Sequence, residues 1–318
     1  MTDVAPHHHP IPGTAEYDEH VREEIEHYGR VYQDDQALKH LMQPVPAAWT
    51  EVEVRSADLI RRLTGNDLVG HVAQRLRDRA GAARMLSLGS GPGGVEIVIA
   101  QNAREAAIVC MDINPDLLEL GRQRAGDMAL NLEFVEADLN TVELPRGAFD
   151  VVFCHAALHH VIELEWLMDQ VARALRPGGV FITTDVVTRN GYLMWPETRE
   201  IVLAIWKLLP ARHRLNHIAY AAPLIDDEIW EADTSLSGME CARSEHILPA
   251  INDRFATEHF VPYLSICRRF FDTMYGPNYD LTAPLDKSIF DWIWEMDRHY
   301  LATKRLRPEN FFGIYRPA

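Results

Sequence analysis

The sequence predicts an α/β protein built on a doubly wound, mostly parallel seven-stranded sheet. Two observations lead to this fold class. From residue 84 onward, short apolar runs alternate with helical patterns, and a glycine-rich turn follows the first of these runs. Strands that are buried on both faces appear as nearly continuous apolar runs, and regular strand–helix alternation is typical of a parallel sheet.

The expected elements follow from apolar periodicity. Five strands are predicted at residues 85–88, 107–111, 132–135, 151–154 and 180–184, separated by helices at 94–101, 115–129 and 164–175. Later in the chain, the pattern predicts strands at 256–264 and 310–316, and helices at 265–274 and 285–302. These last two strands complete a sheet of seven.

The pattern of the first 80 residues predicts helices that precede the first strand of the sheet and pack against it. Apolar residues recur there at spacings of three and four between charged residues, as in an amphipathic helix: Tyr17, Val21, Ile25, Tyr28, Val31 and Tyr32. A second helix is expected over residues 56–79. We expect this region to cover the sheet; a lid over a site and a dimer contact are the alternatives.

Four regions are therefore expected along the chain. Residues 1–80 form an N-terminal tail and helical cover, and residues 81–187 form the α/β core. Residues 188–254, rich in Trp, Pro, His and Arg, form a helical cap insertion without a confident strand. Residues 255–318 supply strands and helices that complete the sheet and roof the cleft. Added segments of this kind usually carry substrate specificity.

Composition excludes several functional classes. The 318 residues carry 31 basic and 47 acidic side chains, a formal charge of -16, which argues against nucleic acid as a partner. No apolar run approaches the roughly 18 residues of a membrane span, and no signal peptide is visible. We therefore expect a cytoplasmic protein that acts on a small molecule, with a homodimer left open.

The sequence assigns no metal site. Four widely spaced cysteines without a C-x-x-C pair indicate buried thiols in a reducing compartment: Cys110, Cys154, Cys241 and Cys267. The run His7-His8-His9 lies between prolines and could hold a metal weakly. We interpret it as part of a flexible tail.

The glycine-rich turn fits two cofactor classes. Gly89, Gly91 and Gly94 match the G-x-G-x-x-G pattern of dinucleotide-binding folds, whereas Gly89, Gly91 and Gly93 match a G-x-G-x-G pattern. Glycine at such positions permits positive φ values and close approach of the backbone to a ligand. The glycines alone do not choose between the two.

Two carboxylates follow the next two strands. Asp112 ends the second strand, where it could accept hydrogen bonds from both ribose hydroxyls of a nucleoside. Asp138 follows the third strand, beside the same cleft. The fourth strand is introduced by Phe149-Asp150, and the helix after it ends in an Arg-Pro-Gly-Gly turn at 176–179.

This ordered series over residues 80–187 resembles the class I S-adenosylmethionine (SAM)-dependent methyltransferases. Residues 158–160 (Leu-His-His) look like the small-molecule group of that family, and residues 191–197 show a weaker resemblance to methyltransferases of glycan- and polysaccharide-modifying clusters. The resemblance implies SAM as cofactor. It implies methylation, on oxygen or nitrogen, of a small polar acceptor such as a sugar, a sugar nucleotide or a natural-product intermediate.

The resemblance also implies a cofactor site. The residues expected there are Ser87, Gly89, Ser90, Gly91, Gly93, Asp112, Ile113, Asp138, Leu139 and His155. Asp112 would hold the ribose, Ile113 would cover the adenine, and Asp138 with Leu139 would contact its edge. Ser87 stands where the family often has an acidic residue near the methionine ammonium, so another group is expected to complete that site.

Histidine is the natural proton acceptor near neutral pH, and a hydroxyl acceptor needs one. His155, at the end of the fourth strand, is the first candidate; His160 and Tyr192 are the others. Three alternatives remain at this point. They are an NAD-dependent oxidoreductase, a non-catalytic subunit with this fold, and a SAM-binding enzyme that catalyses a reaction other than methylation.

Overall fold

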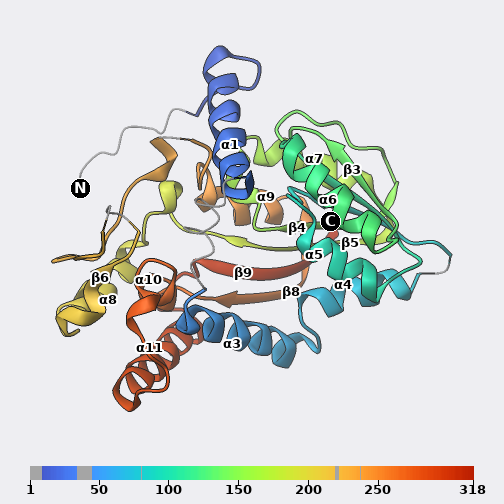
Figure 1. The fold of residues 1–318 in the computed structure, drawn as a ribbon. Helices are drawn as coiled ribbons and strands as arrows, with labels where there is room; N and C mark the ends of the chain where they lie inside the picture. The colour runs from blue at the N-terminus through green and yellow to red at the C-terminus, as the bar shows by residue number, and fades with distance from the viewer. Residues whose placement is uncertain (1–8, 34–44, 80, 219–221, 237) are drawn as a thin grey trace.

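The computed structural model describes residues 9–33, 45–79, 81–218, 222–236 and 238–318 (Figure 1). Seven strands form one sheet in the order β3-β2-β1-β4-β5-β9-β8, which confirms the predicted fold class. The five parallel strands are β1 (Arg84–Leu88), β2 (Ala107–Asp112), β3 (Leu132–Glu136), β4 (Phe149–His155) and β5 (Leu175–Val186). The other two, β8 (Phe255–Tyr263) and β9 (Asn310–Pro317), pair antiparallel at the β5 edge.

Helices cover both faces of the sheet because alternate residues of its buried strands point to opposite sides. In β4, Val152 and Cys154 face a core that includes α7 (Leu164–Ala174) and α9 (Ile247–Asn252). Val151 and Phe153 face the second core. That core is built with α4 (Leu68–Arg77), α5 (Gly94–Asn102) and α6 (Pro115–Asp127).

The strand order places a topological switch beside β1, which lies between β2 and β4. The connections from β1 to β2 and from β3 to β4 run in opposite directions across the sheet. In open α/β sheets this arrangement leaves a crevice outside the carboxyl ends of the strands, and ligands bind there. The glycine turn after β1 lies at this point.

The N-terminal region divides into two parts with different positions. α1 (Ala15–Gln33) lies at the top of the molecule in the view of Figure 1, whereas α3 (Ala47–Thr64) lies below the sheet. The prediction of one helix over residues 56–79 is wrong. α3 ends at Thr64 and is capped by Gly65, whose φ of 92° is left-handed, and α4 begins at Leu68.

α3 joins helices from distant parts of the chain in a third hydrophobic cluster. Its partners are α8 (Pro196–Trp206), α10 (Cys267–Phe271) and α11 (Pro284–Ala302). Trp206 is almost fully buried in this cluster, so it serves as core. The insertion also contains a pair of two-residue strands, β6 (Leu215–Asn216) and β7 (Leu224–Ile225), which the sequence pattern did not predict.

All four cysteines are buried free thiols, as expected. Among the described helices, none combines the length and the apolar character that crossing a bilayer requires.

Candidate cofactor and catalytic site

The glycine turn adopts a backbone that favours glycine. Gly89, Gly91 and Gly93 have φ values of 63°, 51° and 70°, in the left-handed region where a Cβ is strained. A Cβ on Gly89 would also lie 2.3 Å from the Cβ of Ala157, which follows β4. The turn therefore combines an unusual backbone with a close approach between the segments after β1 and β4.

Hydrogen bonds to Asp112 connect the glycine turn to the end of β2. One carboxylate oxygen accepts a hydrogen bond from the Gly91 N–H at 2.7 Å, and the other accepts from the Asn114 N–H at 2.9 Å. Burial raises the pKa of Asp112, and these backbone hydrogen bonds oppose that shift. Because hydroxyl donors would stabilise the buried carboxylate further, Asp112 is suited to hold a ribose.

Asp138 is held from the opposite side by the N-terminal helix. The Tyr17 hydroxyl donates to one oxygen of Asp138 at 2.7 Å, and the Asn140 N–H donates to the other at 2.8 Å. The Asn140 amide also donates to the Tyr17 oxygen at 2.8 Å. Burial, followed by the hydrogen bond to Asp138, raises the pKa of Tyr17, so its hydroxyl stays a donor.

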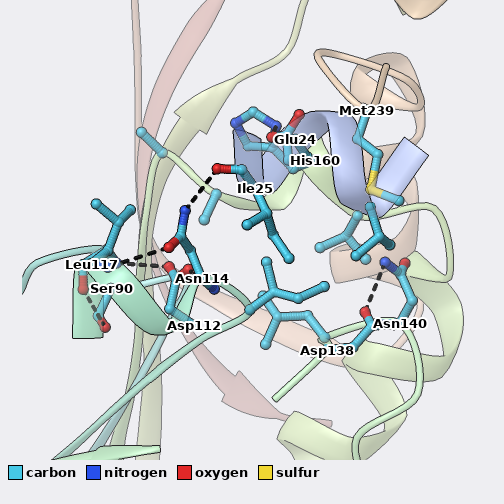
Figure 2. A pocket seen from close by; sticks show the side chains of 18 of the residues that line it. Glu24, Ile25, Ser90, Asp112, Asn114, Leu117, Asp138, Asn140, His160 and Met239 are labelled. Atoms are coloured by element: carbon cyan, nitrogen blue, oxygen red, sulfur yellow. Dashed lines mark hydrogen bonds and ion pairs between the residues drawn. The ribbon is translucent and has the colours of Figure 1, made fainter. Parts of the chain in front are cut away.

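A cavity of about 320 Å³ lies between the glycine turn, the ends of β2 and β4, and α1 (Figure 2). Nine of the predicted site residues line it: Gly89, Ser90, Gly91, Asp112, Ile113, Asp138, Leu139, His155 and His160. α1 contributes Val21, Glu24 and Ile25, and the insertion contributes Met239. α1 therefore forms part of the cavity wall, and the Asn114 amide, which donates to the Ile25 carbonyl at 3.2 Å, holds the helix there.

Two residues predicted to touch the cofactor do not line this cavity. Gly93 is the N-cap of α5, and a Cβ there would lie 3.0 Å from the ring of Phe134, so the close packing of this ring also favours glycine. Ser87 is fully buried, and its hydroxyl donates to a carboxylate oxygen of Glu96 at 2.6 Å. The hydroxyl is therefore not directed at a ligand.

Glu96 is the residue that sequence reasoning missed. It belongs to the first turn of α5, is 2% exposed, and lines a smaller hollow next to the glycine turn together with His155. Burial raises the pKa of Glu96, and the hydrogen bond from Ser87 opposes this. A charged residue within the apolar run Val95 to Ile99 was the available signal.

The three candidate bases have different surroundings. The His155 side chain is accessible from the cavity, and burial among protein atoms lowers its pKa, so the neutral, proton-accepting form prevails at neutral pH. For His160, burial opposes protonation, but the hydrogen bond with Glu24 and the charge of Glu240 raise its pKa to about 9. His155 is therefore the better proton acceptor of the two.

Tyr192 lies elsewhere. Its ring packs against the guanidinium groups of Arg268 and Arg269, 4.9 and 4.6 Å from the ring centroid. Its hydroxyl accepts a hydrogen bond from Arg268, and it is not among the described residues that line the cavity. The structure does not bring Tyr192 together with His155 and His160, so it does not favour Tyr192 as a base.

Residues 86–183 match a family model described as a methyltransferase domain. The chain is 33% identical over 112 residues to a fatty-acid O-methyltransferase of Mycolicibacterium smegmatis, covering 35% of this chain and 40% of that protein. It is 28% identical over 195 residues to a malonyl-[acyl-carrier protein] O-methyltransferase of Enterobacter lignolyticus, covering 60% and 67%.

The crystal structure of an SAM-dependent methyltransferase from Mesorhizobium loti aligns with a TM-score of 0.42 at 19% identity, over 78% of this chain and 96% of that one. Of the two curated relatives named above, the chain spans about two fifths of the fatty-acid O-methyltransferase and two thirds of the malonyl-[acyl-carrier protein] O-methyltransferase. The matched segment contains the glycine turn, Asp112, Asp138 and the Arg-Pro-Gly-Gly turn. Residues 86–183 are therefore a methyltransferase domain, which agrees with the resemblance to the class I SAM-dependent methyltransferases.

Proposed function

We propose that this protein transfers a methyl group from SAM to an oxygen of a small acceptor with an apolar body. The observation that carries the proposal is the cavity at the switch point, lined by the glycine turn, Asp112 and Asp138. The remaining wall of this cavity offers mostly apolar side chains to a ligand: Val21, Ile25, Leu117, Leu139, Val161 and Met239.

The lining does not support the polar acceptor expected from the sequence. That expectation rested on a roof of Trp, Tyr and Arg side chains, but none of these residue types is among the described lining residues. No residue of the 265–305 helices is among them either. By their names, the two curated relatives act on a fatty acid and on a malonyl group of acyl-carrier protein. Both names specify O-methylation, which supports an acceptor oxygen here.

Glu96 supplies the negative charge that Ser87 lacks. Glu96, whose carboxylate accepts a hydrogen bond from Ser87, lines the hollow beside the glycine turn, and the resemblance places the methionine ammonium near this turn. A cation beside this turn would favour the ionised form of Glu96, because opposite charges stabilise each other in a poorly solvated site. With this carboxylate present, Ser87 no longer argues for a non-catalytic subunit.

Methyl transfer to a hydroxyl requires that the acceptor oxygen is aligned with the methyl group of SAM and that a proton acceptor lies nearby. SAM, when bound, supplies a methyl carbon on a positively charged sulfur. His155 lies between the main cavity and the hollow beside Glu96, and its neutral imidazole can take the proton of an acceptor hydroxyl. Val21 and Ile25 of α1 add apolar surface to the cavity wall, which limits the access of water to the reacting groups.

The acceptor class is tested with the full chain and methyl-labelled SAM. We expect label transfer to a long-chain fatty acid or another apolar acceptor with a terminal oxygen, and none to a sugar nucleotide. Labelling of the sugar nucleotide alone would contradict the apolar acceptor while leaving methyl transfer intact. SAM consumption without a methylated product would instead support a SAM-dependent reaction of another kind.

Replacing Tyr17 with Phe tests the role of α1 at the cavity. Tyr17→Phe removes the hydroxyl that joins α1 to Asp138 and Asn140. A hydrogen bond to a charged group contributes about 1.5–3 kcal/mol, so we expect labelled SAM to dissociate roughly 10- to 150-fold faster in a chase experiment. Tyr300→Phe, on α11, is the matched control and should leave the rate unchanged. Equal rates in wild type and Tyr17→Phe would show that α1 does not limit exit.

A further inference from the structure

Two histidines and a glutamate from distant segments meet at the edge of the cofactor cavity. The turn after β4 places His159 and His160 side by side, with ring centroids 4.1 Å apart. Glu240, from the insertion, lies opposite them. Its two carboxylate oxygens are 3.7 Å from Nε2 of His159 and 3.6 Å from Nε2 of His160. The potential ligand atoms of all three residues lie within 4.8 Å of one another.

The other ring nitrogen of each histidine faces a separate carboxylate. His159 Nδ1 lies 2.6 Å from a carboxylate oxygen of Asp185, and His160 Nδ1 lies 2.8 Å from one of Glu24. A metal ion would take the place of the proton on Nε2, while Nδ1 keeps its proton and faces the carboxylate. Metal-binding histidines in proteins are oriented by this type of partner. Both histidines thus direct Nε2 toward Glu240.

The separations suit a bridging ion better than direct hydrogen bonds. The contacts of 3.6 and 3.7 Å from Glu240 exceed the length of a hydrogen bond. Metal–ligand bonds of about 2.0–2.2 Å at tetrahedral angles separate neighbouring ligand atoms by about 3.4 Å. A small adjustment of the Glu240 side chain would therefore bring all three groups into the coordination sphere of one ion.

Charge and access agree with a divalent cation. Three carboxylates (Glu24, Asp185 and Glu240) surround two imidazoles, so this cluster carries enough negative charge to accept a divalent cation in place of the imidazole Nε2 protons. The side chain of Asp185 is fully buried, and that of His159 is 8% exposed, whereas that of Glu240 is 40% exposed. An ion can therefore enter from the Glu240 side.

We propose that His159, His160 and Glu240 bind one divalent transition-metal ion of the Zn²⁺ type. Two imidazoles and one carboxylate form a common ligand set for catalytic zinc, which keeps a further position open. Glu24 and His160 also line the cofactor cavity, so the ion would lie at its edge (Figure 2). Provided the proposed function holds, the open position could bind an oxygen of the acceptor. The sequence alone assigned no metal ligands here.

The test measures Zn²⁺ binding to the full chain by calorimetry. His7, His8 and His9 are first replaced by Ala in every protein, because this run could bind zinc itself. We expect one Zn²⁺ per chain. Glu240→Gln should remove a ligand and weaken binding more than the roughly 10- to 100-fold expected for Glu24→Gln, which loses only an orienting partner. Glu200→Gln, an exposed carboxylate on α8, is the control for the charge change.

Circular dichroism of each variant confirms that it is folded before its affinity is compared. The proposal is overturned if the triple-Ala protein does not bind Zn²⁺, or if Glu240→Gln and Glu24→Gln bind it as tightly as Glu200→Gln does. His160→Gln, which removes a nitrogen ligand, provides a second variant if Glu240→Gln does not fold. Zinc binding is measured without substrate, so the result is independent of methyl transfer.

Discussion

Asp112→Asn should bind SAM roughly 30- to 1,000-fold more weakly than wild type, a loss of about 2–4 kcal/mol. The carboxylate is expected to accept charge-assisted hydrogen bonds from two ribose hydroxyls, while it already accepts from the Gly91 and Asn114 backbone. An amide keeps one acceptor oxygen and loses both the charge and the second acceptor. Calorimetric titration with SAM measures the change.

Asp127→Asn is the matched control, because Asp127 is an exposed carboxylate at the far end of α6. Since Asp112 also fixes the glycine turn, the variant should unfold at a somewhat lower temperature, and affinity is compared per folded molecule. SAM affinity equal to that of Asp127→Asn would mean that the cofactor is bound elsewhere.

His155→Gln should lower the single-turnover rate of methyl transfer by about 10²- to 10⁴-fold, the usual contribution of a general base. SAM affinity should change little, because glutamine preserves the size and polarity of the side chain. The measurement uses labelled SAM and the acceptor identified in the substrate test. His299→Gln, an exposed residue of α11, is the control.

The pH profile separates a base from a packing residue. Burial lowers the pKa of His155 from its ordinary value near 6.5. Wild-type activity should therefore be constant around neutral pH and fall as the pH drops through that lowered pKa, where the imidazole gains a proton. His155→Gln should lose this acid limb. A variant that is slow yet keeps the acid limb would show that His155 is not the titrating base.

Much of the α/β core could be predicted because each of its strands and helices is specified by the apolar pattern of its own short segment. Apolar runs of strand length and the intervening helical patterns specify the five parallel strands, and their carboxyl ends meet at one edge of the sheet. Asp112 and Asp138 are each placed by the strand that precedes them. Their presence around one cavity follows from strand order and direction, without knowledge of distant contacts.

The partners of individual side chains and the ends of helices could not be predicted from local patterns. Ser87 occupies the expected position in β1, but its hydroxyl donates to Glu96 from the next helix. The sequence therefore indicated a missing charge without identifying the residue that supplies it. The single helix predicted over residues 56–79 was also wrong, because Gly65 adopts a left-handed backbone and caps α3 within an otherwise helical pattern.

The sequence by itself determined the fold class, the order of the core strands, the glycine turn and the two carboxylates that point to SAM. Only the tertiary structure decided which distant segments meet at the cavity. Tyr17 and Asp138 are separated by 121 positions, and Glu240 meets His159 and His160 from a separate insertion. The apolar periodicity of a segment indicates which of its faces is buried, but it does not identify the distant segment that covers this face. The partner is selected by the packing of the whole chain.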